Sequence, residues 1–251
     1  MIDFHTHILP QLDDGANDET MAIAMLESEV KQGVTDVLFT PHYYGKTCSP
    51  DDFLEQRNEA WNSLKTHAPV GLNVYLGAEV HFTGVNVMDY EELCKLAIAD
   101  TEYILIEFPF TEQWSIGLLS ALSAFIEETG YTPIIAHVER YLEIKKHPWL
   151  INELLDIGCL LQVNTSAFFN KQEKSLVLAL LNRGIIHCIG TDAHDTGIRK
   201  PNLQEAKTAF EEQGFAEAWA NIQDTMQAVL RGEEVKVRPV KPIKRLFGKY
   251  F

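Results

Sequence analysis

The stretch that decides the fold is residues 149–190, WLINELLDIGCLLQVNTSAFFNKQEKSLVLALLNRGIIHCIG. Its first half is a helical pattern that stops at Gly158, followed by the apolar run Leu160–Asn164. Its second half is a helical pattern that stops at Gly184, followed by Ile185–Gly190. Glycine commonly ends a helix, and short apolar runs suit strands that are buried on both faces of a parallel sheet.

The same alternation runs through the rest of the chain. Seven candidate strands are Ile2–Ile8, Thr35–Thr40, Asn73–Ala78, Tyr103–Phe108, Thr132–Ala136, Leu160–Asn164 and Ile185–Gly190. Helical patterns separate them, and two further ones, Asn202–Gln213 and Ala216–Arg231, follow the last strand. Alternating units require a parallel sheet with right-handed crossovers. We therefore predict a single α/β domain over residues 1–234, because an α/β barrel commonly fills this length as one domain.

Charge is unevenly distributed along the chain. The net charge is −15, from 36 acidic and 21 basic residues. Six of the basic residues fall in a tail of residues 235–251, where there is no acidic residue. The body before that tail therefore carries 36 acidic residues against 15 basic ones. Such a body repels nucleic acid, so we expect no nucleic-acid partner.

The sequence shows no signal for a membrane or for secretion. No apolar run reaches the ~18 residues that a membrane span needs. The start, Met1–His5, lacks the basic and apolar segments of a secretion signal. The four cysteines have no paired spacing, as expected of reduced thiols: Cys48, Cys94, Cys159 and Cys188. We expect a cytoplasmic protein with no integral membrane segment.

Metal-binding side chains stand at or just past the ends of the predicted strands. The carboxyl ends of the strands form the active-site face of an α/β barrel. Nine candidate ligands fall there: His5, His7, Asp14, His42, Glu79, Glu107, His137, Asp192 and His194. Only the sixth strand, which ends at Asn164, offers no strong ligand. Catalytic metals take imidazole and carboxylate ligands, and nine are too many for one ion. The pattern predicts a multinuclear metal hydrolase.

Several neighbouring residues compete for these roles. Asp13 is an alternative to Asp14, which we favour because it directly precedes a turn at Gly15. The remaining histidines are predicted to be packed or surface residues, although His81 would also suit the mouth of the site: His67, His81, His147 and His187. Three aromatic residues are predicted to pack, although an aromatic rim would suit a phenyl ring: Phe108, Phe110 and Trp114.

Two other hydrolase mechanisms are excluded by the sequence. A cysteine-dependent tyrosine phosphatase needs an arginine six positions after its cysteine, and the residues at those positions are Leu54, Asp100, Thr165 and His194. A serine hydrolase of the α/β type needs a Gly-x-Ser-x-Gly elbow, which the sequence lacks. Metal-dependent hydrolysis is therefore the mechanism that the residues favour.

A set of short motifs contains most of the candidate ligands. They are His5-Thr6-His7, Pro41-His42, Gly77-Ala78-Glu79, Ile106-Glu107-Phe108, His137-Val138-Glu139-Arg140 and Asp192-Ala193-His194. Together these motifs resemble the polymerase-and-histidinol-phosphatase (PHP) superfamily. From Met1 to about Arg231, the chain looks most like its bacterial manganese-dependent protein tyrosine phosphatases of capsule and exopolysaccharide operons, the CpsB and YwqE type. The resemblance implies a distorted seven-stranded (β/α)7 TIM-like barrel.

The resemblance also implies how three divalent metal ions share the ligands. The first would be held by His5, His7, Glu79 and Asp192, the second by Glu79 as a bridge with Glu107 and His137, and the third by Asp14, His42 and His194. Mixed nitrogen and oxygen ligands suit manganese, iron or zinc, and the resemblance favours manganese. Other branches often carry histidine where Glu107 and Asp14 stand, so these carboxylates favour the tyrosine phosphatase branch over histidinol phosphatase.

In the mechanism that the resemblance implies, a hydroxide held between two metals attacks phosphorus, and Arg140 and Arg199 grip the phosphoryl oxygens. The alternative for both arginines is a structural ion pair. The implied substrate is a phosphotyrosine protein, namely the tail of a bacterial tyrosine autokinase. A small-metabolite phosphatase of the superfamily, such as histidinol phosphatase, is the main alternative. An amidohydrolase would give no reason for the two arginines, and a non-enzymatic module would tolerate lost ligands, yet none is lost.

The basic tail lies outside this resemblance. Pro239 and Pro242 disfavour a continuous helix there. We expect the tail to fold back onto the acidic body by charge complementarity. The alternative is a docking arm for an anionic membrane or a phosphorylated kinase tail, with apolar anchors at Leu246, Phe247, Tyr250 and Phe251.

Overall fold

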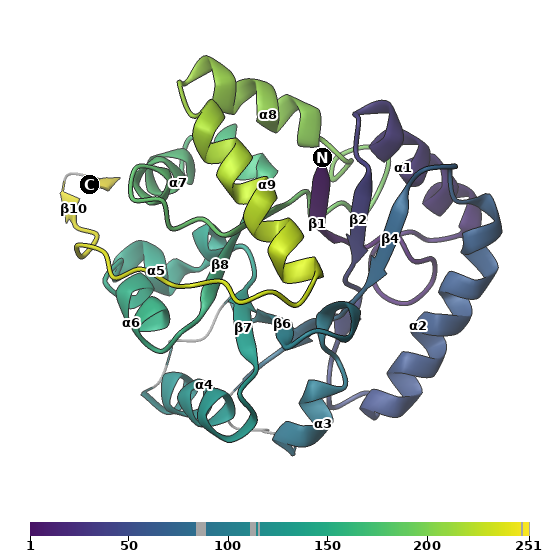
Figure 1. Ribbon diagram of the computed structural model, residues 1–251, viewed down its shortest axis with the longest axis horizontal. Helices are drawn as coiled ribbons and strands as arrows, with labels where there is room; N and C mark the ends of the chain where they lie inside the picture. Colours follow the sequence, from purple (N-terminus) through teal and green to yellow (C-terminus); the bar gives the residue numbers. More distant parts are fainter. Residues whose placement is uncertain (84–88, 111–113, 115, 247, 251) are drawn as a thin grey trace.

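Short parallel strands follow one another along the chain and are separated by helices (Figure 1). The structure, a computed structural model, describes residues 1–83, 89–110, 114, 116–246 and 248–250. The strands of the first half are β1 Ile2–Thr6, β2 Asp36–Phe39, β3 His42–Tyr43, β4 Asn73–Leu76 and β5 Glu79–His81. Those of the second half are β6 Tyr103–Glu107, β7 Thr132–Ile135, β8 Leu160–Asn164 and β9 Cys188–Gly190.

These strands form a curled parallel sheet. One hydrogen-bonded stretch has the order β1-β2-β4 and the other the order β3-β5-β6-β7-β8-β9. The residues after β9 return to β1, where His7 N donates to Ala193 O at 2.9 Å and Asp192 N donates to His5 O at 2.8 Å. The predicted α/β class with a parallel sheet is therefore confirmed.

Two of the predicted strands are interrupted. The predicted strand Thr35–Thr40 is β2, and the chain pairs again as β3 only after Pro41. Proline has no backbone N–H to give to a sheet, which accounts for the break. The predicted strand Asn73–Ala78 likewise ends at β4, and β5 begins after Gly77 and Ala78. Each interruption brings a candidate ligand, His42 or Glu79, to the first position of the new short strand.

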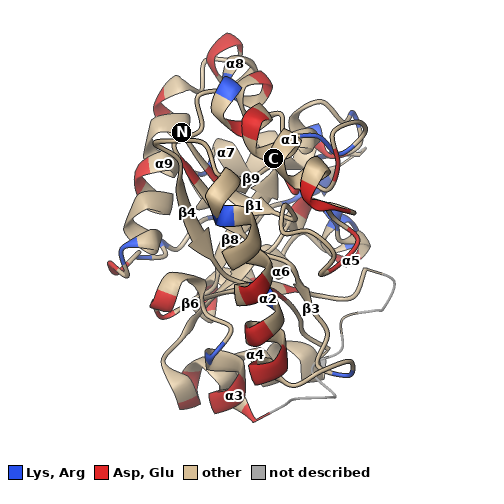
Figure 2. Ribbon diagram, turned by 90° about the vertical axis from the view of Figure 1, so that its right-hand side faces the viewer, with Lys and Arg blue, Asp and Glu red and all other residues tan. Residues whose placement is uncertain are grey.

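Helices cover the outside of the sheet (Figure 1). They are α1 Glu19–Lys31, α2 Pro50–Leu64, α3 Tyr90–Cys94, α4 Ile116–Thr129, α5 Leu142–Lys146, α6 Leu150–Asp156, α7 Lys174–Leu181, α8 Leu203–Glu212 and α9 Ala216–Leu230. The Asp18 side chain caps α1 by accepting from Met21 N at 2.8 Å. Acidic residues stand in the first turns of α2 and α3, so negative charge is displayed on these helices (Figure 2).

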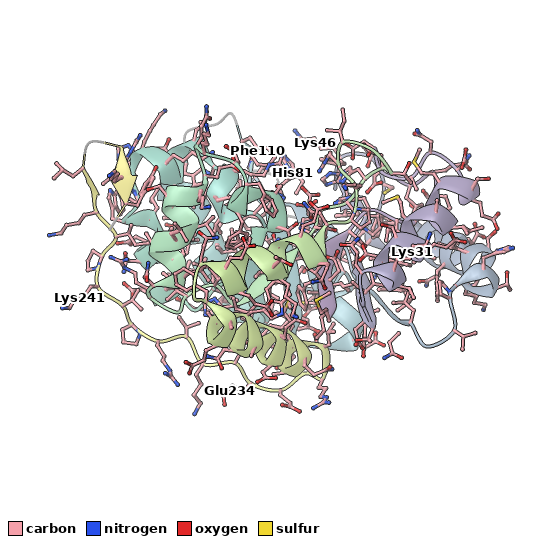
Figure 3. The ribbon with its side chains drawn as sticks, turned by 90° about the horizontal axis from the view of Figure 1, so that it is seen from above. Lys31, Lys46, His81, Phe110, Glu234 and Lys241 are labelled. Atoms are coloured by element: carbon pink, nitrogen blue, oxygen red, sulfur yellow. The ribbon has the colours of Figure 1, made fainter. Side chains whose placement is uncertain are left out.

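The amino ends of the strands are covered by α9. Ile2 N in β1 donates to Gln223 Oε1 at 2.7 Å, and Ile189 N in β9 donates to Met226 Sδ at 3.3 Å. The opposite, carboxyl ends carry His81 and Phe110, which Figure 3 shows on the far side of the molecule from α9 and Glu234. The carboxyl ends of the strands, where an active site is expected, are therefore not covered by α9.

The C-terminal strap, defined as residues 235–246, runs back over the body of the protein (Figure 1). Ile243 in the strap is buried. The Asn152 side chain binds the strap at two points: its Nδ2 donates to Val240 O at 3.1 Å, and its Oδ1 accepts from Ile243 N at 3.4 Å. Arg183 Nε donates to Lys241 O at 3.3 Å. A hairpin of β10 Arg245–Leu246 and β11 Lys249–Tyr250 follows.

Charge complementarity, the expected cause of this folding back, gains no support from ion pairs among the described residues. The six basic side chains of residues 235–251 are exposed, and none makes an ion pair within the part of the chain that the structure describes. Apolar contacts and hydrogen bonds between side chains and backbone hold the strap. Phe247 and Phe251 lie outside the described residues. Over those same described ranges, no helix has the length and apolar character that a membrane span requires.

Candidate metal centre

All nine predicted ligands meet at the carboxyl ends of the strands. They form four overlapping groups whose donor atoms lie within 4.8 Å of one another: His7, Asp14, His42 and His194; His5, Glu79 and His137; His5, His7 and Asp192; and His42, Glu79 and Glu107. None of the nine is left outside these groups. The strand-end prediction and the topology therefore bring the same side chains together.

Glu79 lies at the centre of the cluster. Its Oε2 is 3.2 Å from His5 Nε2, 3.3 Å from His7 Nε2 and 3.0 Å from His42 Nδ1. Its Oε1 is 2.7 Å from His137 Nε2. Burial opposes ionisation, but the surrounding imidazoles hold the pKa of Glu79 well below its ordinary value. A buried carboxylate in contact with ligands of two groups through different oxygens has the position of a bridge.

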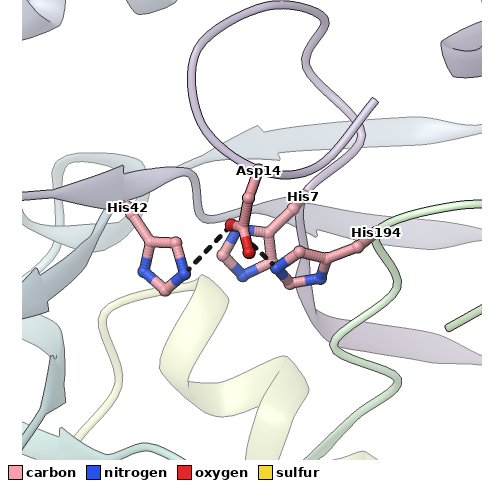
Figure 4. Close-up of side chains that lie close together, drawn as sticks. All are labelled: His7, Asp14, His42 and His194. Carbon is pink, nitrogen blue, oxygen red and sulfur yellow. Dashed lines mark ion pairs between the residues drawn. The ribbon is translucent and has the colours of Figure 1, made fainter. Parts of the chain in front are cut away.

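The most open group joins the loop after β1 to three histidines (Figure 4). Asp14 Oδ1 is 3.3 Å from His194 Nε2 and 3.5 Å from His42 Nε2. The Asp14 side chain is 67% exposed, whereas that of His194 is 3% exposed. An ion held here would therefore lie at the mouth of the site, with room for exchangeable ligands from solvent.

Outer acceptors fix the orientation of three of the imidazoles. His5 Nδ1 lies 3.4 Å from Gln162 Oε1, and His7 Nδ1 lies 2.7 Å from Asp13 Oδ2. His194 Nδ1 lies 2.9 Å from the backbone oxygen of Asp192. A neutral ring that donates from Nδ1 has its lone pair on Nε2. In all three residues Nε2 is the atom that faces the cluster. Metal-binding histidines are held by outer partners of this kind.

The arrangement of the donor atoms suits the binding of divalent cations better than hydrogen bonding between the donor atoms themselves. His5 Nε2 and His7 Nε2, both lone-pair carriers in these tautomers, are 3.1 Å apart. His42 Nδ1, Glu79 Oε2 and His194 Nε2 are buried and make no hydrogen bond among the described residues, although each lies within an ion-pair contact of 3.0–3.3 Å. Leaving such atoms buried without a partner costs about 1–3 kcal/mol each. Cations between these nitrogen and carboxylate donors would remove that cost, and this donor set suits manganese, iron or zinc.

Two of the ligand residues have a strained backbone. His137 has φ of 32° and Asp192 has φ of 53°, a region that residues other than glycine seldom occupy. The neighbouring structure holds them there, since His137 N donates to Gln162 Oε1 at 2.5 Å. Close packing of β9 on β1 also constrains this region, because a Cβ on Gly190 would lie 2.4 Å from His5 Cβ. Strain of this kind is typical of functional sites.

Arg140 and Arg199 converge on one oxygen of Asp192. Asp192 Oδ2 is 3.1 Å from Arg140 Nη1 and 2.8 Å from Arg199 Nη2, and it also accepts from Asn164 Nδ2 at 2.8 Å. Asp192 Oδ1 faces His7 Nε2 at 3.4 Å. Both arginine side chains are 37% exposed. Both arginines therefore make the ion pairs expected if their role were structural. Their partly exposed guanidinium groups could also contact an anion at the mouth of the site.

The supporting roles of three residues were not predicted from the sequence, although Asp13 was considered as an alternative ligand. Asp13 contacts His7 and is no member of the ligand groups, whereas Asp14 is. Gln162 and Asn164 come from β8, the strand that was expected to offer no ligand. Both are buried, and they alternate, so they point to the same side of the strand. The presence of two polar residues at alternate positions of an otherwise apolar strand could have indicated their role from the sequence.

Aromatic rings line the mouth of the site. The Tyr44 ring centroid is 5.4 Å from that of His42 and 5.3 Å from that of His81. On another side, the Phe110 ring is 5.2 Å from the His137 ring, and Arg140 Cζ lies 4.5 Å from the Phe110 centroid. His81 and Phe110 therefore belong to the rim. Phe110 was predicted to pack, and its position at the rim favours the alternative of an aromatic rim.

The other competing residues lie away from the cluster. Phe108 is buried, and Trp114 packs against it with centroids 4.8 Å apart, as predicted. His67 pairs with Glu19 at the surface, and His147 is exposed. All four cysteines are free thiols, two of them buried. Burial raises the pKa of the Cys159 and Cys188 thiols, which opposes any role as a nucleophile.

Similar proteins carry the same architecture. The Bacillus subtilis tyrosine-protein phosphatase YwqE is 33% identical over 258 residues, covering 99% of this chain and 99% of that protein. One of the crystal structures of YwqE from Bacillus subtilis and CpsB from Streptococcus pneumoniae, described as unique metal-dependent tyrosine phosphatases, aligns over 98% of this chain and 100% of its own with a TM-score of 0.81 at 30% identity. A phosphotriesterase homology protein from Escherichia coli aligns over 90% of this chain and 97% of its own with a TM-score of 0.54 at 12% identity, a likeness of fold alone.

The family itself is identified by a match over most of the chain. Residues 1–226 match the family described as capsular polysaccharide synthesis, CpsB/CapC. The match spans β1 to most of α9 and so includes every residue of the metal cluster. The resemblance predicted from the sequence motifs is confirmed: the chain belongs to the CpsB/CapC family.

Proposed function

We propose that this chain is a metal-dependent protein tyrosine phosphatase. The observation that carries the proposal is the cluster of nine ligands with two arginines beside it. The tyrosine phosphatases to which the chain is similar support the same reaction. We further propose that β2 with β3, and β4 with β5, act as interrupted strands of a seven-stranded barrel formed by residues 1–234. Residues 235–251 lie outside this catalytic body.

Three divalent ions, best matched by manganese, would occupy the cluster. The proposed sets follow the family resemblance and divide the nine residues differently from the four geometric groups described above. They are His5, His7, Glu79 and Asp192; Glu79, Glu107 and His137; and Asp14, His42 and His194. Bound ions of this kind activate water for attack on phosphorus and stabilise phosphoryl charge. The outer acceptors, such as Asp13 on His7, keep the imidazole lone pairs directed at the ions.

Arg140 and Arg199 would hold the phosphoryl group in place. They enter from separate loops on either side of Asp192, and their heads are 2.8–3.1 Å from the same carboxylate oxygen. Guanidinium groups bind phosphoryl oxygens through paired N–H donors, and they stabilise the charge on those oxygens in the transition state. Phe110 lies under Arg140 and limits the directions in which that head can turn.

The aromatic rim favours an aryl phosphate. Tyr44, His81 and Phe110 surround the mouth, where the ring of a phosphotyrosine would lie against them. Tyrosine departs as a phenolate with an ordinary pKa of about 10, so protonation of the leaving group matters less than for an alkyl alcohol. The proposed natural substrate is the phosphorylated tail of a bacterial tyrosine kinase, in the cytoplasm.

One comparison tests this function. The metal is removed, Mn²⁺ is restored, and hydrolysis rates are measured with a phosphotyrosine peptide, a phosphoserine peptide and histidinol phosphate. The proposal expects a clear preference in kcat/KM for the phosphotyrosine peptide. A preference for histidinol phosphate would replace it with the small-metabolite alternative. Activity that persists without metal would contradict the role of the cluster.

A further inference from the structure

A second pocket lies at the end of the barrel opposite the metal centre. Its volume is about 440 Å³, and it is walled by α9, by the loop between α7 and β9 and by the start of the C-terminal strap. His187, one of its lining residues, directly precedes β9, whereas Asp192 and His194 follow the other end of that strand. Figure 3 shows Glu234, which directly precedes the strap, on the side away from His81 and Phe110. The pocket is therefore separate from the proposed catalytic site.

The pocket is positively charged in a strongly acidic protein. Arg183, Lys236 and Arg238 line it, and its described lining residues include no carboxylate. The chain as a whole has a net charge of −15. Arg183 is held in place by Ala179 O and Lys241 O, which accept from its Nη1 and Nε at 2.9 and 3.3 Å. Three cations around one concave space attract an anion.

A buried histidine adds a neutral donor to the pocket. His187 is 8% exposed, and its Nδ1 accepts from Leu161 N at 3.0 Å. The proton of the neutral ring is therefore on Nε2. Burial lowers the pKa of His187 to about 4, so the ring is neutral near pH 7. Within the described part of the chain, no partner for this Nε2–H is found, and the ring lines the pocket.

The remaining walls are apolar. Ile185, Ile186 and Ile222 line the pocket beside the polar side chains of Asn221 and Thr225. A volume of this size lies within the range of small-molecule sites, about 300–1,000 Å³. An apolar floor beside a cationic rim suits a ligand with an organic body and a charged end. A small inorganic ion would leave most of this space unused.

We propose that this pocket binds an organic phosphate, with its phosphate group among Arg183, Lys236, Arg238 and the His187 Nε2–H and its organic body against the isoleucines. Several donors and three positive charges exceed what a single carboxylate needs, whereas a phosphate monoester offers three oxygens and about two charges. The site goes beyond the proposed phosphatase reaction, and it gives the basic tail a ligand-binding role.

The test counts binding sites on the Mn²⁺-loaded full chain. Phenylphosphonate is the probe, because it is not hydrolysed, and equilibrium dialysis gives its stoichiometry and Kd. The double variant Lys236→Ala with Arg238→Ala should bind one equivalent fewer than the parent, while its turnover of a small aryl phosphate stays unchanged. The matched control, Lys241→Ala with Lys244→Ala, removes two charges from the same strap outside the pocket and should bind as the parent does.

Two further measurements sharpen the outcome. Asn221→Asp places a carboxylate in the wall with little change of shape, and it should weaken phenylphosphonate binding at this site about tenfold or more. Inorganic phosphate should bind this site more weakly than phenylphosphonate, because it cannot use the apolar floor. Equal stoichiometry in parent and Lys236/Arg238 variant would overturn the proposal. An equal loss in the pocket and control variants would also overturn it, since it would reveal only a general effect of charge.

Discussion

Replacing Asp13 by Asn tests how the metal centre is held. Asp13 Oδ2 accepts from His7 Nδ1 at 2.7 Å and from His42 N at 2.8 Å, and its Oδ1 accepts from Gly15 N at 2.9 Å. Burial works against ionisation, yet the pairing with His7 lowers the pKa of Asp13, so it is ionised near pH 7. The Asp13→Asn variant keeps the shape but removes the charge and one accepting oxygen.

The size of the effect follows from the lost interaction. A hydrogen bond to a charged group contributes about 1.5–3 kcal/mol. In the proposed centre, His7 would present Nε2 to the metal only while its Nδ1 donates to Asp13, so that energy would be lost from metal binding. At about 1.4 kcal/mol per factor of ten, the expected loss of Mn²⁺ affinity is roughly 10- to 100-fold. Changes to outer partners of metal-binding histidines generally fall in this range.

The assay is a titration of the metal-free protein with Mn²⁺, read by turnover of a small aryl phosphate. The half-saturating Mn²⁺ concentration should rise by roughly 10- to 100-fold, while turnover at saturating Mn²⁺ recovers to near the parent value. The control is Asp36→Asn, because Asp36 is also buried and accepts from Asn73 Nδ2 at 2.9 Å, away from the cluster. An unchanged Mn²⁺ requirement in a folded Asp13→Asn protein would refute the orienting role.

Four further outcomes are expected. Elemental analysis after gentle purification should find about three metals per chain, and a ratio fixed at one under saturating Mn²⁺ would contradict the trinuclear centre. Arg140→Ala and Arg199→Ala should each lower kcat by roughly 10²-fold with metal content intact, and parental turnover in both would make the arginines structural. The folded pKa of His187, about 4, lies below its unfolded value of about 6.5, so its contribution to stability is present above pH ~6.5 and is lost as pH falls towards 4. Denaturant titrations of His187→Asn should therefore lack roughly 3 kcal/mol of the parent's pH dependence over that window, and parallel curves would disprove the assignment. Deleting the residues after Arg238 removes buried Ile243 and should lower Tm, in the direction of the ~2–5 kcal/mol that loss of a buried Ile costs, and an unchanged Tm would show that the strap adds no stability.

The order of strands and helices was predictable from the sequence, but the interruptions were not. Apolar runs ending at turn residues located β1, β6, β7 and β8 within about two residues. The apolar pattern continues to Thr40, yet the strand stops at Phe39, and the chain pairs again only at His42. Which residues stay paired around Pro41 depends on the curvature of the neighbouring strands, and that is not a property of local sequence.

The candidate ligands were predictable because they are directly coupled to the strands. His5 lies near the end of β1, His42 and Glu79 open β3 and β5, and His137 follows β7. Topology alone therefore gathers these four residues. The residues that hydrogen-bond to the candidate ligands have no such fixed position relative to the strands. Asp13 differs from Asp14 by one position, and the turn that directs one inwards and the other to the mouth involves Gly15, whose Cβ would lie 2.1 Å from a backbone oxygen of His7.

The strand without a ligand supplies the framework of the site. Gln162 Oε1 accepts from His137 N at 2.5 Å and contacts His5 Nδ1 at 3.4 Å, while Gln162 Nε2 donates to Asn164 Oδ1 at 2.9 Å. Asn164 Nδ2 then donates to Asp192 Oδ2 at 2.8 Å. Each amide has one accepting and one donating end, so this chain of contacts runs in one direction only. A carboxylate at either position has no N–H group and could not donate the next hydrogen bond in this chain. Because β8 lies between β7 and β9, its two amides reach candidate ligands on both sides. The proposed metal centre would therefore be supported by polar side chains from a strand that supplies no candidate ligand.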